Sequence, residues 1–404
     1  MTHSYWLDTT IEFEKKDLVD RHQYDVIIIG AGIAGLSTAY WLEKNNPSIQ
    51  IAILDRNRIG FGASGRNAGF ITCGSAEHFQ KLEKQFGLDQ AAKIWHFSDT
   101  NRELLRSEII QDDFDSVDFL MTGSCTVAAS AEDWSRYQKL ALTMKSVGLD
   151  VELSDQSTLS KNFGVRNFLG GIRYKNDGVI HPVKLLKKIK SKLKNTQFLQ
   201  DVQFQSSVQH AGFWTIKTQH NTLTAEKIIF CLNGYAPDLI PELKNLIKPQ
   251  RGQIIVTEAV PKFIQGPCYL TKHLCYFRQL PNGEILVGGF RNQDLIAENT
   301  SEDLVTEKIQ KALTEFTEDY FQDLKNIKIN YRWSGIMGFT PDGQMILGQL
   351  PEKKNQFVMA GCSGHGMGLS FHAAKVLVES LSGRKILPHL DVNRFTPSFF
   401  QKEF

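Results

Sequence analysis

Residues 25–35 read Asp-Val-Ile-Ile-Ile-Gly-Ala-Gly-Ile-Ala-Gly and constrain the fold more than any other stretch of the chain. The β-branched residues 26–29 predict a buried strand, and residues 36–44 have the apolar spacing of a helix. Gly30, Gly32 and Gly35 would allow a tight turn, leave backbone N–H groups open and let the helix pack closely on the strand. A strand, a glycine-rich turn and a helix in this order predict a site for a dinucleotide pyrophosphate at the helix N-terminus.

A second expected strand, residues 50–55, ends in Asp55, which lies 20 positions after Gly35. A carboxylate at this point accepts hydrogen bonds from ribose hydroxyls and would repel a 2′-phosphate, which argues against NADP. Chance or a purely structural use of the glycines is the minor alternative. The candidate cofactor-binding residues of this region are Gly30, Gly32, Ile33, Ala34, Gly35, Asp55 and Arg56.

Composition narrows the class of protein. The 404 residues suggest two or three domains, and 42% hydrophobic with 22% charged residues is ordinary for a globular chain. The 46 Lys and Arg against 44 Asp and Glu leave a net charge of +2, which favours neither nucleic acid nor a membrane surface as a partner. Residues 184–194 hold six lysines among helically spaced apolar residues, so we expect the polar face of an amphipathic helix rather than a binding patch.

The six cysteines are scattered, with no C-x-x-C pair and no His/Cys cluster, so we expect neither a metal site nor a disulfide framework. Such cysteine usage suits a reducing compartment. Residues 1–21 carry charges throughout and lack the apolar core of a signal peptide. The longest apolar segment, residues 26–42, contains the glycine fingerprint and is not read as a membrane span. We therefore expect a cytoplasmic protein without an integral membrane segment.

Residue patterns predict helices and strands in two blocks. After the first strand–helix–strand unit, helices are expected over 76–112 and 131–147. The middle of the chain is rich in expected strands, at 213–217, 223–230, 252–258, 274–279 and 284–290. A helical stretch over 301–324, strands at 327–333 and 356–360, and a helix over 366–382 follow. The expected fold class is α/β (α+β), with a Rossmann-type nucleotide domain interrupted by an antiparallel-sheet domain.

Residues 60–69 read Gly-Phe-Gly-Ala-Ser-Gly-Arg-Asn-Ala-Gly. Together with residues 232–235, 251–253, 331–335 and 363–366, this loop closely resembles the D-amino-acid oxidase superfamily of FAD enzymes. The chain is most similar to its γ-glutamylputrescine oxidoreductase subgroup and to the glycine and sarcosine oxidases. Residues 4–6 (Ser-Tyr-Trp) and 180–182 (Ile-His-Pro) fit the same subgroup. The motifs span nearly the whole chain in the expected order.

The resemblance implies a discontinuous FAD-binding domain, here residues 25–80, 148–238 and 327–390, and a substrate domain of residues 81–147 and 239–326. Residues 1–24 would be an N-terminal extension and 391–404 a C-terminal tail. It also implies oxidation of a C–N bond to an imine by hydride transfer to flavin N5.

The family's motifs also assign cofactor contacts. The resemblance places Gly62, Ala63, Ser64, Gly65, Arg66, Asn67, Ala68 and Gly69 along the flavin. It places Val202 at the adenine, with Asn233 and Gly234 as further contacts, and Gly364, His365, Gly366 and Met367 at the pyrimidine end of the ring.

Several of these roles have alternatives. Arg66 could simply pair with a carboxylate, and His365 could shuttle protons or serve only the cofactor. His181, beside a proline, is favoured as a helix cap or cofactor neighbour over a base. Tyr276 and Arg278 lie two apart on one strand, so they share a face that points either to substrate or to solvent. The catalytic candidates are His365, Tyr276 and Arg278.

Departures from the family pattern bear on the substrate and the acceptor. Met337 falls where glycine and D-amino-acid oxidases carry a carboxylate-binding arginine, which favours an amine over a simple α-amino acid. Residues 334–339 contain no cysteine, so the FAD is expected to be non-covalent. Residues 284–287 lack the lysine that activates oxygen in sarcosine oxidases, which leaves oxygen or another compound as the acceptor.

The sequence is therefore interpreted as an FAD-dependent amine oxidoreductase acting on a small amine, primary or secondary and possibly γ-glutamylated. The alternatives are an amino-acid or hydroxy-acid dehydrogenase that passes electrons to a quinone, and a flavin-binding protein without turnover. An NAD-binding module is disfavoured, because residues 60–69 and 363–366 would then have no purpose.

Overall fold

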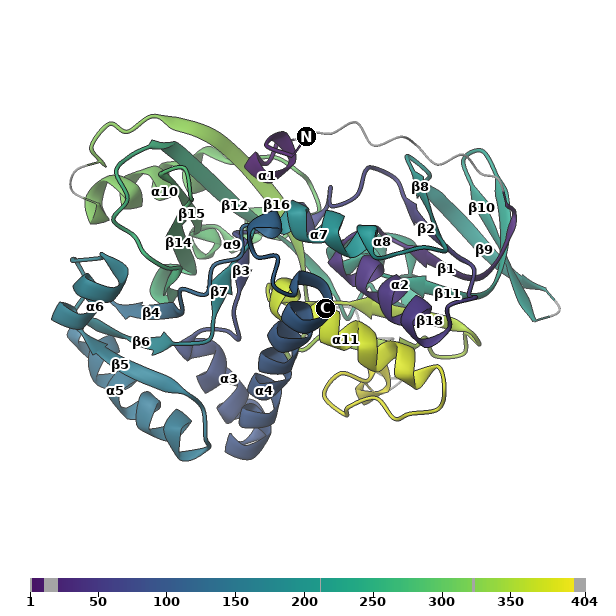
Figure 1. Ribbon diagram of the computed structural model, residues 1–404, viewed down its shortest axis with the longest axis horizontal. Coiled ribbons are helices and arrows are strands. Elements are labelled where there is room, and N and C mark those ends of the chain that lie inside the picture. The colour runs from purple at the N-terminus through teal and green to yellow at the C-terminus, as the bar shows by residue number, and fades with distance from the viewer. Residues whose placement is uncertain (1, 11–20, 211, 322–323, 396–404) are drawn as a thin grey trace.

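The computed structural model describes residues 2–10, 21–210, 212–321 and 324–395. The described chain forms two eight-stranded sheets at opposite ends of the molecule, and a two-stranded ladder joins β3 (Phe70–Ile71) to β7 (Gly178–Val179) (Figure 1). The expected mixed fold with a parallel and an antiparallel sheet is confirmed.

The first sheet is built around the fingerprint strand β1 (Gln23–Ile29). This strand pairs in parallel with β2 (Ile51–Asp55) on one side and β11 (Thr222–Phe230) on the other. The sheet is completed by β8 (Thr196–Gln200), β18 (Gln356–Ala360), the edge strand β17 (Ile346–Gln349) and the hairpin of β9 (Phe204–His210) and β10 (Phe213–Thr218). Strands from distant parts of the chain thus meet in one sheet.

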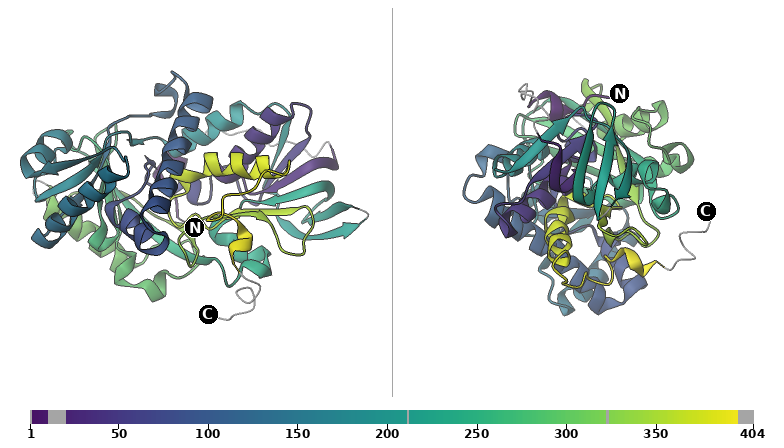
Figure 2. Two further views of the ribbon diagram at one scale, coloured as in Figure 1. Left: turned by 90° about the horizontal axis from the view of Figure 1, so that it is seen from below. Right: turned by 90° about the vertical axis from the view of Figure 1, so that its right-hand side faces the viewer.

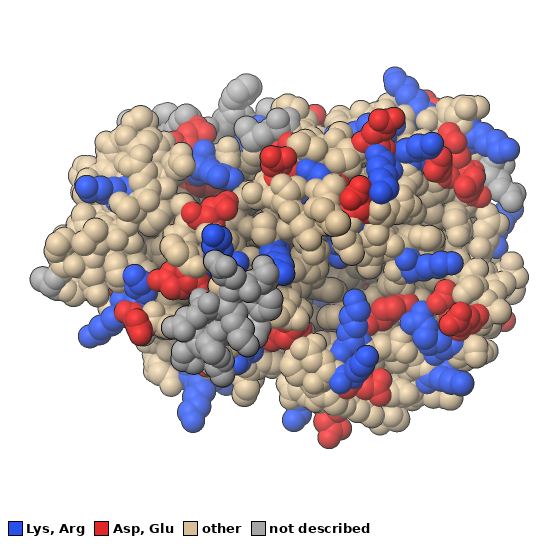
Figure 3. All heavy atoms as spheres, turned by 180° about the vertical axis from the view of Figure 1, so that it is seen from behind, with Lys and Arg blue, Asp and Glu red and all other residues tan. Residues whose placement is uncertain are grey.

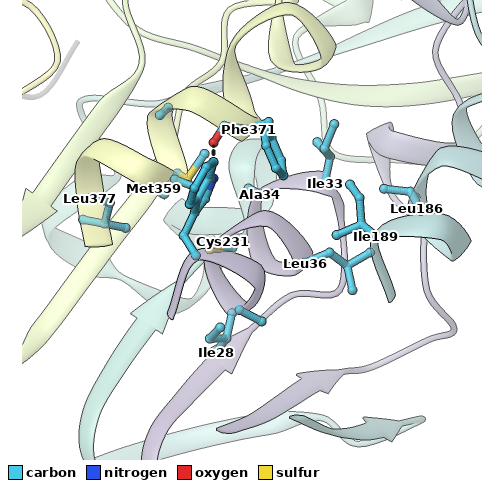
Figure 4. Packing of buried hydrophobic residues seen from close by; sticks show 14 of the residues in the cluster. Ile28, Ile33, Ala34, Leu36, Leu186, Ile189, Cys231, Met359, Phe371 and Leu377 are labelled. Carbon is cyan, nitrogen blue, oxygen red and sulfur yellow. Dashed lines mark hydrogen bonds between the residues drawn. The ribbon is translucent and has the colours of Figure 1, made fainter. Parts of the chain in front are cut away.

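Three helices cover one face of this sheet: α2 (Ile33–Asn45), α7 (Pro182–Ser191) and α11 (Gly366–Ser380). Their apolar side chains pack with those of β1 and β18 in one core, where Ile28, Leu36, Ile189 and Phe371 converge (Figure 4). The indole of Trp41 on α2 donates a hydrogen bond to the carbonyl of Phe371 on α11 (2.8 Å), which ties the first helix to the last. Helix α7 is the expected lysine-bearing amphipathic helix.

The second sheet lies at the other end of the molecule. In order its strands are β16 (Ile329–Phe339), β12 (Lys248–Ala259), β15 (Glu284–Gly289), β14 (Cys275–Gln279), β13 (Cys268–Leu270), β4 (Ser124–Ala128), β6 (Gly170–Tyr174) and β5 (Val151–Asp155). All neighbours are antiparallel except the parallel pair β13–β4. Four helices pack on or beside it: α3 (Ala76–Phe86), α5 (Ala131–Ser146), α6 (Gln156–Phe163) and α10 (Glu307–Tyr320).

The structure differs from the expected elements at two helices. The stretch expected over 76–112 divides at Gly87, whose φ of +81° ends α3 and starts α4 (Leu88–Leu104), with a π-helical turn at Leu105–Ile110. A residue in that region of backbone space cannot continue a right-handed helix. Helix α10 begins at Glu307, six residues later than the start expected at 301.

The two sheets also divide the chain differently from the expected domain boundaries. Strands β5 and β6 fall within 148–238, and β16 falls within 327–390, yet all three belong to the second sheet. Helix α4, inside 81–147, packs against α11 on the nucleotide side (Figure 2, left). Strand β16 belongs to the second sheet because it pairs with β12, from Lys248–Phe339 to Thr257–Ile329. The two strands are far apart in the sequence, so no local pattern encodes this pairing.

The N-terminal segment is an integral part of the described structure. Helix α1 (Tyr5–Asp8) lies against the glycine-rich loop, where the Ser4 hydroxyl donates to the Gly65 carbonyl (2.7 Å) and the Trp6 indole to the Asn67 carbonyl (2.6 Å). The expected tail is described only to residue 395.

Charged side chains of both signs lie on the surface (Figure 3). Acidic and basic side chains are interspersed on the face of Figure 3, with no field of a single sign. Among the described residues, no helix has the length and apolar character needed to cross a membrane. The described residues also contain no group of three or more His, Cys, Asp or Glu suited to a metal ion.

Candidate active site

A cavity of about 500 Å³ runs from the fingerprint turn to the second sheet. At one end it is lined by the first sheet and its turns, and at the other by aromatic and apolar side chains of β12, β13, β14 and β16. This volume suits an organic cofactor together with a small substrate.

The glycine fingerprint builds the nucleotide end of the cavity. Gly32 is the N-cap of α2 and offers no side chain to cap the helix, and the Ile33 amide donates to the Ser64 hydroxyl (2.9 Å). A Cβ atom at residue 35 would lie 1.9 Å from the Gly30 carbonyl oxygen, so only glycine allows this contact between helix and turn. The N-terminus of α2 therefore faces the cavity with unpaired N–H groups and with the positive end of the helix dipole.

Asp55 stands at the end of β2 on the cavity wall. Its carboxylate accepts hydrogen bonds from the Ala31 and Asn57 amides, both at 2.8 Å. Burial raises the pKa of Asp55, and the two amide bonds oppose that shift. Each carboxylate oxygen keeps a further lone pair, so the side chain can also accept from a hydroxyl in the cavity.

Arg66 pairs with a carboxylate, which was one of its two expected roles, and its contact with the flavin stays a prediction. It lines the cavity, and its guanidinium forms an ion pair with Asp303 (3.1 Å) and donates to the carbonyl oxygens of Phe61 (2.7 Å) and Ser334 (3.0 Å). Burial lowers the pKa of Arg66, whereas Asp303 raises it. Much of its charge is therefore balanced inside the protein. Arg66 thus holds the glycine-rich loop of residues 60–69, from here on the flavin-motif loop, onto β16.

The far end of the cavity is walled by side chains of the second sheet. Tyr269, Tyr276 and Met337 line it, together with Phe70 of β3 and Thr72 just beyond that strand. The hydroxyls of Tyr269 and Thr72 lie 2.8 Å apart. Burial raises the pKa of Tyr269 and of Tyr276, so both phenols stay neutral. The wall is thus mostly apolar, with hydroxyl groups as its polar points.

His365 precedes α11 at the edge of this end. Its Nδ1 lies 3.0 Å from the Ser363 carbonyl oxygen, a contact that needs a proton on Nδ1 and leaves Nε2 as an acceptor. Its ring stacks on His78 at 4.1 Å between centroids. Burial lowers the pKa of both imidazoles, and each is therefore neutral at pH 7.

Comparison with known proteins agrees with this geometry. The sequence model of the FAD dependent oxidoreductase (DAO) family matches residues 25–380. This chain belongs to that family.

Curated relatives cover most of the chain. The enzyme is 26% identical to the γ-glutamylputrescine oxidoreductase of Escherichia coli K12, over 95% of this chain and 89% of that protein. It is 22% identical to the glycine oxidase of Geobacillus kaustophilus, over 90% of this chain and 94% of that protein.

Solved structures show the same fold. The L-proline dehydrogenase of P. horikoshii superposes with a TM-score of 0.77 at 17% identity, covering 94% of this chain and 98% of that one. The glycine oxidase of Bacillus cereus gives a TM-score of 0.75 at 16% identity, covering 90% and 96%.

FAD is the cofactor of this oxidoreductase, and the cavity fits it. The open N-terminus of α2 suits the pyrophosphate, and Asp55 has acceptor capacity for the ribose. The candidates of the nucleotide end and loop that line the cavity are Gly30, Gly32, Ile33, Ala34, Asp55, Arg56, Gly62, Ala63, Ser64, Arg66, Asn67, Ala68 and Val202. Asn233, Gly364, His365, Gly366, Met367 and the candidate catalytic Tyr276 line it as well.

Four predicted glycines do not line the cavity and act through packing: Gly35, Gly65, Gly69 and Gly234. A Cβ atom at residue 65 would lie 2.2 Å from the Gly60 carbonyl oxygen, and one at residue 234 would lie 2.9 Å from the Met337 backbone. These glycines allow the loops to approach each other closely.

Arg278 is placed differently from the expectation. It does not line the cavity, and its buried guanidinium donates to the carbonyl oxygens of Ala68 (3.2 Å), Gly69 (3.0 Å) and Ile180 (3.2 Å). The face of β14 that it shares with Tyr276 is covered at this point by the loop, so it points neither to solvent nor to substrate. These contacts position the loop, and a catalytic role for Arg278 stays a prediction that they do not support.

His181 is a helix cap, in line with the favoured alternative. Its Nδ1 accepts from the Lys184 amide (3.3 Å) at the start of α7, and it does not line the cavity.

Tyr269 and Tyr235 line the cavity and were not predicted from the sequence. Tyr235 belongs to the quoted motif at 232–235 and could have been included, and the Arg56 guanidinium lies 4.7 Å from its ring centroid. Tyr269 sits on a strand of only three residues, which leaves no periodic signal to find it.

Proposed function

We propose that this FAD-dependent oxidoreductase oxidises an amine, primary or secondary and including γ-glutamylated amines, at a C–N bond to give the imine. The observation that carries the proposal is Met337 on the cavity wall. A thioether cannot form the paired hydrogen bonds by which an arginine binds a carboxylate, so a small α-amino acid would lack that partner here. The likeness to a γ-glutamylputrescine oxidoreductase supports the same substrate class.

Bound FAD supplies the redox chemistry by accepting a hydride equivalent at N5 of its ring. The chain binds the cofactor through the fingerprint and loop and keeps water from the reacting carbon with Phe70, Tyr269 and Tyr276. An amine reacts only in its neutral form, and the mostly apolar wall disfavours the ammonium ion. The tyrosine hydroxyls can hydrogen-bond the neutral nitrogen, and His365, with Nε2 free of its proton, remains a candidate proton acceptor.

We also expect the FAD to be non-covalent. Cys231 and Cys362 line the cavity, and burial raises the pKa of each thiol to about 12. A protonated thiol is a poor nucleophile, so it is unsuited to bonding a flavin.

The test is anaerobic bleaching of the bound flavin with γ-glutamylputrescine, putrescine, glycine, D-alanine and sarcosine. We expect the best amine to reduce the flavin faster than the three amino acids, and Met337→Arg to raise the relative rates for glycine and D-alanine. Met337→Leu is the matched control and should leave the ranking unchanged. Comparable rates for D-alanine and the best amine in the wild-type enzyme would contradict the proposal.

The preferred electron acceptor is identified with the same reduced enzyme. Mixing the reduced enzyme with oxygen or with a soluble quinone shows which of the two reoxidises it faster. Strand β15 (Glu284–Gly289) contains no lysine, so slow reaction with oxygen is the expected result.

A further inference from the structure

Arg291 is a partly buried cation near the substrate end of the cavity, although it is not among the residues that line the cavity. It directly follows β15, where Phe290 has a φ of +62° and turns the chain into the short helix at Arg291–Gln293. Its guanidinium carbon lies 5.0 Å from the centroid of the Phe339 ring at the end of β16. This turn sets the arginine across the end of the strand that carries Met337.

The surroundings of Phe339 connect Arg291 to the cavity. A Cβ atom at Gly364 would lie 3.8 Å from the Met337 sulfur and 3.9 Å from the tip of the Phe339 ring, so both side chains face the same loop. Burial raises the pKa of Tyr276, and the charge of Arg291 opposes that shift. Burial lowers the pKa of His365, and the same arginine adds to the lowering. The guanidinium therefore acts on both neighbouring cavity residues.

Arg291 has no partner among the described residues apart from the Phe339 ring. Its Nε is buried without a hydrogen bond, and its terminal nitrogens form no hydrogen bond or ion pair with the described chain. The buried arginines Arg251 and Arg278 differ at their other donors, although the Nε of Arg278 is unpaired as well. Arg251 is paired with Glu298 at 2.9 Å, for example, and Arg278 bonds three carbonyl oxygens.

The Nε atom of Arg291 is shielded from water and has no hydrogen bond, which is unfavourable for a polar group, whereas its terminal nitrogens are accessible to a ligand. Burial lowers the pKa of Arg291, which reflects the same cost. Its planar fork of donors matches a carboxylate, and a ligand carboxylate would complete the missing interactions.

The position of Arg291 also indicates where that carboxylate would lie. Phe339 is two residues beyond Met337 on the same face of β16, which displaces the contact by about 7 Å along the strand. A carboxylate bound by Arg291 would therefore lie some distance along β16 from Met337. Met337 occupies the position at which the family's short amino-acid substrates would place their carboxylate. This spacing fits a longer substrate whose carboxylate is remote from the reacting C–N bond.

We infer that Arg291 is a specificity-determining residue that binds a carboxylate at the distal end of the substrate. The inference rests on the proposed amine oxidation, since it names the part of the substrate opposite the reacting nitrogen. Arg291 selects amines that carry a remote carboxylate over simple diamines.

Two measurements test it on the FAD-loaded enzyme. In the first, calorimetry compares glutarate with its neutral diamide. Wild-type enzyme should bind glutarate more tightly, and Arg291→Gln should weaken glutarate binding about 10- to 100-fold without affecting the diamide. Arg291→Lys should give an intermediate loss, because it keeps the charge without the fork. Arg384→Gln, which removes an exposed guanidinium at the end of α11, is the control and should bind as the wild type does.

In the second measurement, anaerobic flavin reduction compares γ-glutamylputrescine with 4-aminobutanoylputrescine, which lacks only the α-carboxylate. Arg291→Gln should raise the half-saturating concentration about 10- to 100-fold for the first compound and leave the second unchanged. Equal effects on both, or glutarate binding that survives Arg291→Gln, would overturn the inference. Glutarate binding that depends on Arg291, in an enzyme that no amine reduces, would instead reject the proposed function and keep the anion site.

Discussion

The guanidinium of Arg66 forms an ion pair with the carboxylate of Asp303 at 3.1 Å, with 4% and 12% of the two side chains exposed. Asp303 also accepts a hydrogen bond from the Ser334 hydroxyl (2.8 Å) on β16. The pair therefore joins the flavin-motif loop to the second sheet directly beside the cavity.

Asp303→Asn should lower the free energy of unfolding by about 3 kcal/mol, because it leaves a buried guanidinium without its counter-charge. The uncompensated charge should also shift the FAD reduction potential in the positive direction, since it favours an anionic reduced flavin. Urea denaturation and dye equilibration measure the two effects. Glu315→Gln, which breaks an exposed 3.7 Å pair with Lys311, should cost under about 0.5 kcal/mol. Similar losses in both variants would show that the Arg66 pair contributes no more than a surface pair.

Gly32→Val should yield protein without FAD. A Cβ atom at this position would lie 2.9 Å from the Ser64 hydroxyl, and the branched side chain would occupy the space at the N-terminus of α2. The ratio of flavin to protein absorbance measures the loss. Gly343→Asn lies in open space at a φ of +72°, which asparagine tolerates, and should retain full FAD. In the wild type, acid should release all flavin into the supernatant, and flavin remaining on the precipitated chain would contradict non-covalent binding.

Tyr276 and Arg278 share a strand but should give different defects. Tyr276→Phe removes a hydroxyl at the cavity wall, so we expect a higher half-saturating amine concentration with a nearly unchanged flavin spectrum. Arg278→Ala removes the hydrogen bonds to the carbonyl oxygens of Ala68, Gly69 and Ile180, of which Gly69 keeps one from the Ile180 amide, so we expect lower stability and weaker FAD retention. Stopped-flow reduction and thermal unfolding separate the two. An unchanged half-saturation in Tyr276→Phe would place the amine elsewhere in the cavity.

His181 should make the protein sensitive to acid. Burial lowers its pKa from 6.5 to about 4, so below pH 6.5 the unfolded chain binds a proton that the folded chain does not. The free energy of unfolding therefore does not depend on this proton above pH 6.5. It falls by up to about 3 kcal/mol as the pH drops to 4. His181→Asn keeps a helix cap without that proton, so its unfolding free energy should depend less on pH over this range. The exposed His210→Asn is the control, and equal pH profiles for the two variants would refute the assignment.

The nucleotide end could be predicted because its information is local. The strand, the glycine turn, the helix and Asp55 lie within 31 successive residues, and Gly35 meets Gly30 across five positions. The same holds for part of the loop motif, in which the Asn67 side-chain amide donates to the carbonyl oxygens of Ala63 and Ser64. Family resemblance then indicated the cofactor.

What only the tertiary structure decided depends on contacts between distant segments. Arg66 meets Asp303 across 237 positions, and Arg278 reaches carbonyl oxygens 98 to 210 positions away, so no local pattern distinguishes an ion pair or a loop contact from a catalytic role. Strand β16 belongs to the second sheet because it pairs with β12, which is far from it in the sequence. Arg291, which the sequence leaves unremarked, lies beside the substrate end because one left-handed residue turns the chain there. The sequence by itself determined the cofactor site through short-range geometry, whereas the substrate end arose from strand pairing and burial, which act between residues that are far apart in the chain.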